Sequence, residues 1–268
     1  MAQISLMSYE NEVRGLIEAR AFDEAMAVGR HILQYYPKHI ETYRLLAEAC
    51  LGSGRYKEAI DLFLRVLSVD PEDVASRVGL SEAYEAEGDI NSAVLQMNEA
   101  FDLTPSSAQI RSELHRLIEK QTGQAAPKLK LTRRGLGRIY MRGGLYTQAA
   151  DEFETLLRED PDQLDIEVSL AEALWRDGQR IRAIEVCQNI LNKLPHCLKA
   201  NLILAETWLR SDREDEAEEH LQIVRDLDPE GRLSREIMGD DSPIPRAPVH
   251  LPVLEDILAA PQQPFVPA

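Results

Sequence analysis

The stretch GSGRYKEAIDLFLRVLSVDPED, Gly52 to Asp73, holds a glycine-bearing turn, an amphipathic run with an early alanine and a closing Asp-Pro pair. The same arrangement recurs along the chain, because prolines close six units and neighbouring prolines lie 34 residues apart within each group of three. These prolines are Pro37, Pro71, Pro105, Pro161, Pro195 and Pro229. A fixed period of roughly 20 to 50 residues indicates a repeat architecture, in which the quoted stretch is one unit.

Two other positions keep the same step as the prolines. Alanines open the second helix of each unit at Ala25, Ala59, Ala93, Ala149, Ala183 and Ala217. Glycine or a polar residue marks the turn between the paired helices at Arg20, Gly54, Gly88, Gly144, Gly178 and Asp212. A break in the helix is needed at these turns, so each unit is predicted to be a helix-turn-helix.

Composition and cysteine usage indicate a cytoplasmic protein. The chain is 44% hydrophobic and 28% charged, and no run approaches the roughly 18 apolar residues that a membrane span needs. The start of the chain carries Glu10 and Glu12 where a secretion signal would have its apolar stretch. The three cysteines, Cys50, Cys187 and Cys197, have apolar neighbours and are predicted to be buried thiols in a reducing compartment.

These positions resemble the tetratricopeptide repeat. From Ile40 the pattern positions are Tyr43, Leu46, Ala47, Cys50, Ala59, Phe63 and Pro71, and from Lys130 they are Arg133, Leu136, Gly137, Tyr140, Ala149, Phe153 and Pro161. The first and last repeats match less well. The resemblance implies an all-α fold of helix-turn-helix repeats that form a right-handed superhelical solenoid, followed by a proline-rich C-terminal tail.

The repeats fall into two blocks of three. We expect repeats at 6–39, 40–73 and 74–107 with a capping helix at 108–121, a linker at 122–129, and repeats at 130–163, 164–197 and 198–231. The sequence leaves open whether the linker is a hinge or the blocks pack into one interrupted superhelix.

Most periodic residues are predicted to be structural. One helical pair cannot bury its apolar face alone, whereas stacked neighbours bury a continuous one. Small residues let the paired helices approach closely, and the large ones are expected in the core rather than in contact with a ligand. The large residues expected in the core are Phe63, Tyr84, Met97, Tyr140 and Phe153.

The segment 232–268 differs in composition from the repeats. Seven of the 14 prolines lie between Pro243 and Pro267, a density that disfavours long helices and favours a partly disordered, extended tail. A cluster of five apolar residues around Glu255 and Asp256 lies at 251–258. Two interpretations stay open for this cluster, a docking motif or a cap on the last repeat.

No motif of catalysis, cofactor binding or metal binding is present in the sequence. It contains no Gly-rich phosphate loop, no His-Glu-x-x-His, no Cys-x-x-Cys and no Gly-x-Ser-x-Gly. His196 beside Cys197 makes a poor ligand set for a metal. We therefore expect neither an enzyme nor a cofactor.

The charge is distributed unevenly. The net charge of −16 comprises −9 in residues 1–107, +7 in 108–150, −12 in 151–231 and −2 in the tail. Arg134, Arg138 and Arg142 recur every four residues and should form one stripe on a helix. The stripe is interpreted either as a ligand contact or as a salt-bridged surface that faces acidic neighbours. Nucleic acid is disfavoured because the flanking acidic segments would repel phosphates.

In the tetratricopeptide family the first helix of each pair lines the concave groove, and the resemblance places the stripe there. Some members hold a peptide carboxylate with a clamp of basic and asparagine side chains. Arg134, Arg138 and Lys199 match such positions here, whereas Ser169 and Ile203 depart from the clamp pattern. The predicted peptide-binding residues are Arg134, Arg138, Arg142, Ser169, Trp175, Lys199, Leu202 and Ile203.

The predicted function is a protein-interaction adaptor that binds an acidic or apolar peptide of an unidentified partner. Its tail is complementary to the groove in charge and apolar surface, so we expect autoinhibitory docking of the tail in its own groove or in that of a second copy. The alternative is a structural assembly module that acts through self-association. No membrane span or nucleic acid is implied.

The assigned register predicts the effect of enlarging an interface alanine. Replacing Ala59 or Ala183 by Leu should overpack a helix pair and lower the free energy of unfolding by about 1 to 3 kcal/mol. Thermal melting followed by circular dichroism measures this loss. Unchanged melting of both variants would contradict the register.

Overall fold

The computed structural model describes residues 3–125 and 127–254. Within these residues the chain forms fourteen α-helices, one short 3-10 helix and two short strands. The first half contains β1 (Gln3–Ser5), α1 (Leu6–Glu18), α2 (Phe22–Tyr35), α3 (Ile40–Gly52), α4 (Tyr56–Val69), α5 (Val74–Glu87), α6 (Ile90–Leu103) and α7 (Ala108–Thr122). The second half contains α8 (Arg133–Arg142), α9 (Tyr146–Glu159), α10 (Leu164–Arg176), α11 (Arg180–Lys193), α12 (Leu198–Leu209), α13 (Glu214–Leu227), α14 (Arg232–Met238), η1 (Gly239–Asp241) and β2 (His250–Pro252).

The helices pair in sequence order, as expected for a solenoid of helical repeats. The predicted all-α fold class is confirmed. Every turn within a pair has one residue with positive φ, at Arg20, Gly54, Gly88, Gly144, Gly178 and Asp212. Glycine adopts this conformation at no steric cost, which explains why four of these six positions are glycine.

Close approach of the helices depends on small residues. The six alanines that open the second helices are fully buried. A Cβ on Gly137 would lie 2.5 Å from Cε1 of Phe153, and one on Gly79 would lie 2.3 Å from Cζ of Phe63. Both phenylalanines are buried, as is Met97, in agreement with their predicted place in the core.

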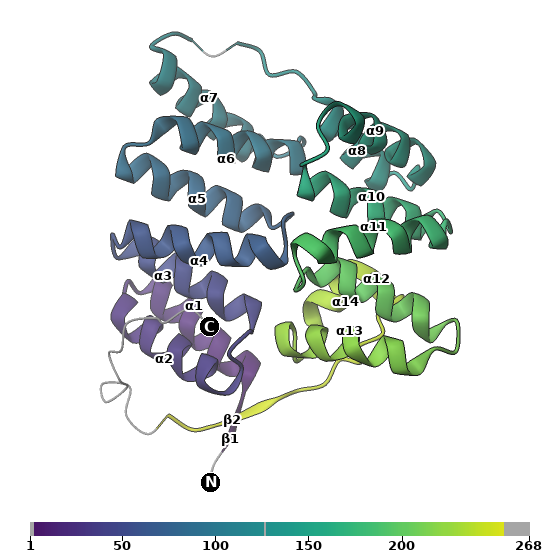
Figure 1. Ribbon diagram of the computed structural model, residues 1–268. Helices are drawn as coiled ribbons and strands as arrows, with labels where there is room; N and C mark the ends of the chain where they lie inside the picture. Colours follow the sequence, from purple (N-terminus) through teal and green to yellow (C-terminus); the bar gives the residue numbers. More distant parts are fainter. Residues whose placement is uncertain (1–2, 126, 255–268) are drawn as a thin grey trace.

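The two blocks lie side by side rather than end to end. Figure 1 shows α1 to α7 in one column and α8 to α14 in the other, with the connector between α7 and α8 at one end. At the opposite end β2 pairs with β1 in an antiparallel arrangement that places Leu251 opposite Ile4. The blocks are therefore joined at both ends, and we call this arrangement the closed form.

A few apolar residues anchor the tail segment 232–254 to the repeats, although many of its other residues are exposed. Met238 and Ile244 belong to the hydrophobic core of the second block, whereas Leu251 is fully buried in that of the first. The Tyr9 hydroxyl donates a hydrogen bond to the Pro252 carbonyl oxygen at 3.1 Å. Spaced apolar residues explain this anchoring, because Met238 and Ile244 reach the core of the second block and Leu251 that of the first, despite the prolines between them.

The position of Leu251 differs from the expected docking in the groove of the second block. Leu251 packs on the first block, because backbone pairing with β1 provides hydrogen bonds that the groove does not. Residues 255–258 of the predicted docking segment lie outside the described residues.

The three cysteines are free and buried, as predicted. Within the described residues, no helix is long and apolar enough to cross a membrane.

The closed form predicts a stabilising role for Leu251. Replacing Leu251 by Ala should lower the free energy of unfolding by about 2 to 5 kcal/mol, because a fully buried side chain is lost from the core of the first block. Urea denaturation measures this loss. The control is Leu95→Ala on α6, whose side chain is 55% exposed and whose substitution should change little. Equal stability of the two variants would contradict the packing of the tail.

Candidate functional site

The predicted arginine stripe lies on α8 and faces the first block. Thr132 caps this helix, because its Oγ1 accepts a hydrogen bond from the Gly135 N–H at 3.0 Å. Arg142 donates to the Leu103 carbonyl oxygen at 2.6 Å. Arg134 lies 3.3 Å from a carboxylate oxygen of Asp165. Each arginine is therefore held by acceptors of the chain itself.

Arg138 contacts a carboxylate from the other block. Its guanidinium forms an ion pair with Glu72, which lies in the turn between α4 and α5. Lys199 from α12 pairs with the same carboxylate, and the Ser169 hydroxyl of α10 donates a hydrogen bond to it. Three first helices of the second block thus converge on one acidic side chain of the first block.

This contact is largely removed from solvent. The side chains of Glu72, Arg138 and Lys199 are 10%, 11% and 12% exposed. Burial lowers the pKa of Arg138 to about 10, although Asp165 and other acids oppose the shift. The guanidinium therefore keeps its charge at neutral pH. Its Nε atom is buried and has no hydrogen-bond partner among the described residues, so one donor of the site is unused.

Glu172 of α10 is a second carboxylate partner of Lys199. Burial raises the pKa of Glu172, but the charges of Lys199 and Arg176 outweigh this effect and hold the pKa at about 2. Lys199 thus bridges two carboxylates, one from each block. Because Lys199 pairs with both Glu72 and Glu172, the predicted groove has an ordered charge pattern rather than a free positive patch.

The turn that carries Glu72 is itself well ordered. Asp70 accepts a hydrogen bond from the Glu72 N–H at 3.1 Å, and Asp73 caps α5 by accepting one from the Ser76 N–H at 2.9 Å. Arg44 lies 3.0 Å from Asp73. Pro71 restricts the backbone further. The carboxylate of Glu72 is consequently presented from a rigid support.

Glu72 is the middle member of a row. The residue after the closing proline is Lys38 in the first repeat, Glu72 in the second and Ser106 in the third. Lys38 pairs with Asp226 at 3.1 Å, and the Ser106 hydroxyl accepts a hydrogen bond from Arg142 at 3.2 Å. All three turns of the first block therefore touch the second block.

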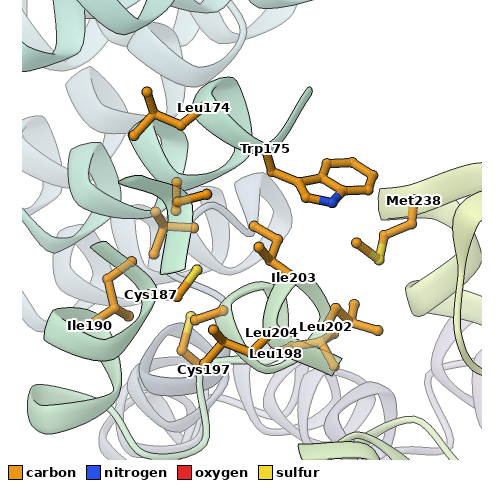
Figure 2. Packing of buried hydrophobic residues seen from close by; sticks show 14 of the residues in the cluster. Leu174, Trp175, Cys187, Ile190, Cys197, Leu198, Leu202, Ile203, Leu204 and Met238 are labelled. Carbon is orange, nitrogen blue, oxygen red and sulfur yellow. The ribbon is translucent and has the colours of Figure 1, made fainter. Parts of the chain in front are cut away.

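The apolar residues of the predicted site are buried in a core to which α14 contributes Met238. Trp175, Leu202 and Ile203 are 8%, 0% and 1% exposed. The Trp175 indole donates to Glu206 at 2.8 Å, and Figure 2 shows it directed toward Met238 of α14. These three residues belong to the core of the closed form.

The eight predicted residues thus divide into two groups. Arg138, Ser169 and Lys199 lie together around the Glu72 turn, Arg134 shares Asp165 with Arg138, and Arg142 lies beside the neighbouring turn. Trp175, Leu202 and Ile203 lie in the hydrophobic core that also contains Met238 of α14. Sequence reasoning missed Glu72, although its place after the closing proline, shared with Lys38 and Ser106, marks an edge of the solenoid.

No metal-binding arrangement is found in the part of the chain that the structure describes. It holds no group of three or more His, Cys, Asp or Glu side chains suited to a metal. Burial raises the pKa of the Cys50 and Cys197 thiols to about 11, which disfavours the reactive thiolate.

Comparison with known proteins finds tetratricopeptide repeat models over both blocks. One model matches residues 16–75 and 51–117, and a second matches 134–193 and 168–232. Human DnaJ homolog subfamily C member 3 is 23% identical over an alignment of 229 positions, which covers 74% of this chain and 45% of that protein. The chain thus spans about half the length of this curated relative.

Solved structures with a similar fold include tetratricopeptide proteins. The TPR2AB-domain:pHSP90 complex of yeast Sti1 is 20% identical, with a TM-score of 0.40, and covers 86% of this chain and 95% of that one. The P58(IPK) TPR domain is 16% identical, with a TM-score of 0.38, and covers 88% and 64%.

The buried contact predicts a large effect of removing Arg138. Arg138→Met should lower the free energy of unfolding by about 3 to 5 kcal/mol, because Glu72 and Asp165 lose their buried partner. Urea denaturation measures the loss. In the control, Arg133→Met, an arginine that is 48% exposed is removed from the same helix, and the change should stay within about 0.5 kcal/mol. A loss below about 1 kcal/mol for Arg138→Met would show that the contact is not stabilising.

Proposed function

Because the chain belongs to the tetratricopeptide repeat family, whose members generally act as interaction modules, we propose that it is a non-catalytic adaptor that binds an acidic or apolar segment of a partner protein. The proposed site is the concave groove of the second block, formed by α8, α10 and α12. A single observation carries the proposal: Arg138, Ser169 and Lys199 come from three successive repeats and already hold one carboxylate, that of Glu72.

The charges in the groove favour an acidic ligand. Arg134 and Arg138 supply two guanidinium groups and Lys199 an ammonium group, and the Ser169 hydroxyl can donate a further hydrogen bond. Arginine and lysine hold carboxylates through charge-assisted hydrogen bonds, which are stronger than neutral ones. A partner acid in the position of Glu72 would meet Arg138, Lys199 and the Ser169 hydroxyl, with Arg134 nearby through Asp165.

The tail restricts the apolar part of this groove. Trp175, Leu202 and Ile203 share a buried core with Met238 of α14, and Arg176 holds this helix by donating to the Ile237 carbonyl oxygen at 2.7 Å. An apolar partner segment would reach these residues only after displacing α14. The proposed autoinhibition by the tail therefore acts on the apolar half of the site. The buried free thiols also favour a cytoplasmic location.

Affinity capture with the full chain, followed by measured binding of each captured protein, tests the proposed function. Lys199→Gln should weaken binding of a true partner at least about tenfold, which corresponds to about 1.4 kcal/mol. Lys193→Gln is the matched control, since Lys193 lies in the same block, is 42% exposed and pairs with Glu167 away from Glu72. Equal binding of a partner to both variants would place its site elsewhere and refute the proposal.

A further inference from the structure

We infer that the turn Asp70–Asp73 is a built-in ligand of the second block, and that the groove selects an internal acidic turn of a partner which competes with Glu72. This inference rests on the proposed function and names both the ligand class of that site and its regulation. The occupant is part of a folded loop. The donors therefore hold a side-chain carboxylate, with no chain terminus involved.

Sequence separation shows that the contact joins independent parts of the solenoid. Glu72 lies 97 residues from Ser169 and 127 residues from Lys199. Contacts within a solenoid normally join neighbouring repeats only. The Glu72 contact is thus additional to repeat stacking, and each block can keep its own core when the contact opens.

Apolar contact accompanies the acid. Val69, which directly precedes the turn, packs against the hydrophobic cores of both blocks, and Pro71 is buried. The occupant therefore has an apolar residue three positions before the gripped carboxylate, with Asp-Pro between them. The same order, apolar-Asp-Pro-Glu, defines the partner segment that the groove would accept.

The energetics allow a partner to compete. A buried ion pair gains little net free energy, because desolvation of both charges offsets their attraction. The flanking contacts of the row are weak, since the Lys38–Asp226 pair is largely exposed. The buried Arg138 Nε has no partner in the closed form, so a ligand with an additional acceptor would gain a hydrogen bond that Glu72 does not make.

The connector between α7 and α8 determines the affinity that a partner needs to displace the Glu72 turn. The two blocks are tethered, so the turn is present at an effective concentration in the millimolar range, roughly as for short flexible linkers. Acidic peptides that bind the second block only weakly would not displace Glu72 from the closed form. Removal of the Glu72 charge should therefore raise the affinity for an external acidic turn.

A peptide copy of the turn provides the test. The probe is fluorescein-labelled LSVDPEDVAS, residues 67–76, and its binding to the full chain is followed by fluorescence anisotropy. Glu72→Gln should bind the probe at least about tenfold more tightly than the wild type. A probe with Gln in place of the glutamate should lose this gain. Asp162→Asn is the control variant, because Asp162 occupies the same turn position in the second block and is exposed.

Equal affinity of the wild type and Glu72→Gln for the probe, or binding by neither, would overturn the inference. A second measurement needs no variant: small-angle scattering of the wild type should show a larger radius of gyration at saturating unlabelled probe, and an unchanged radius would also overturn it. Failure of the proposed function gives a different result: the captured partners would bind Lys199→Gln as tightly as the wild type. A partner that requires Lys199 but binds wild type and Glu72→Gln equally would retain the function and reject the competition.

Discussion

The close approach of paired helices is the constraint on which the rest of the structure depends. Each pair exposes an apolar face that only the next pair can cover, and this covering requires small residues at the crossing points. Fully buried Ala59 and Ala183 meet that need in the second helices, and Gly137 meets it where Phe153 leaves no room for a Cβ. Because every unit repeats the same crossing, the helices stack at a constant step.

The constant spacing of the repeats also aligns equivalent residues along the edges of the solenoid. Residues 34 positions apart lie at the same edge of the solenoid, so the turns after Pro37, Pro71 and Pro105 form a row without any contact between them. First helices in the other block place Arg138, Ser169 and Lys199 in a second row by the same rule. The closed form brings the two rows together. The charges pair because one row holds a glutamate and the other two cations.

Closure has two different origins. At the end near β1 it depends on backbone hydrogen bonds, on the buried Leu251 and on the ion pairs of Arg232 with Glu10 and Glu41. In the middle it depends on the ions around Glu72, whose attraction is largely offset by desolvation. The end near β1 is thus held by backbone pairing and apolar burial in addition to charge, whereas the centre is held mainly by charge. A groove held in this way can exchange its acidic occupant while the repeats keep their cores.

The sequence by itself determined the helix pairs, the turn positions such as Gly54 and Gly144, the buried alanines and the arginine stripe on one face of α8. All of these depend on contacts within one repeat or between neighbouring repeats. Such contacts require the same residue types every 34 positions, so the sequence pattern indicates them. Only the tertiary structure decided that Glu72 occupies the predicted groove, that α14 covers Trp175, and that Leu251 packs on the first block. These contacts join residues about 60 or more positions apart. No period records them, because they depend on how far the whole stack curves before its two halves meet.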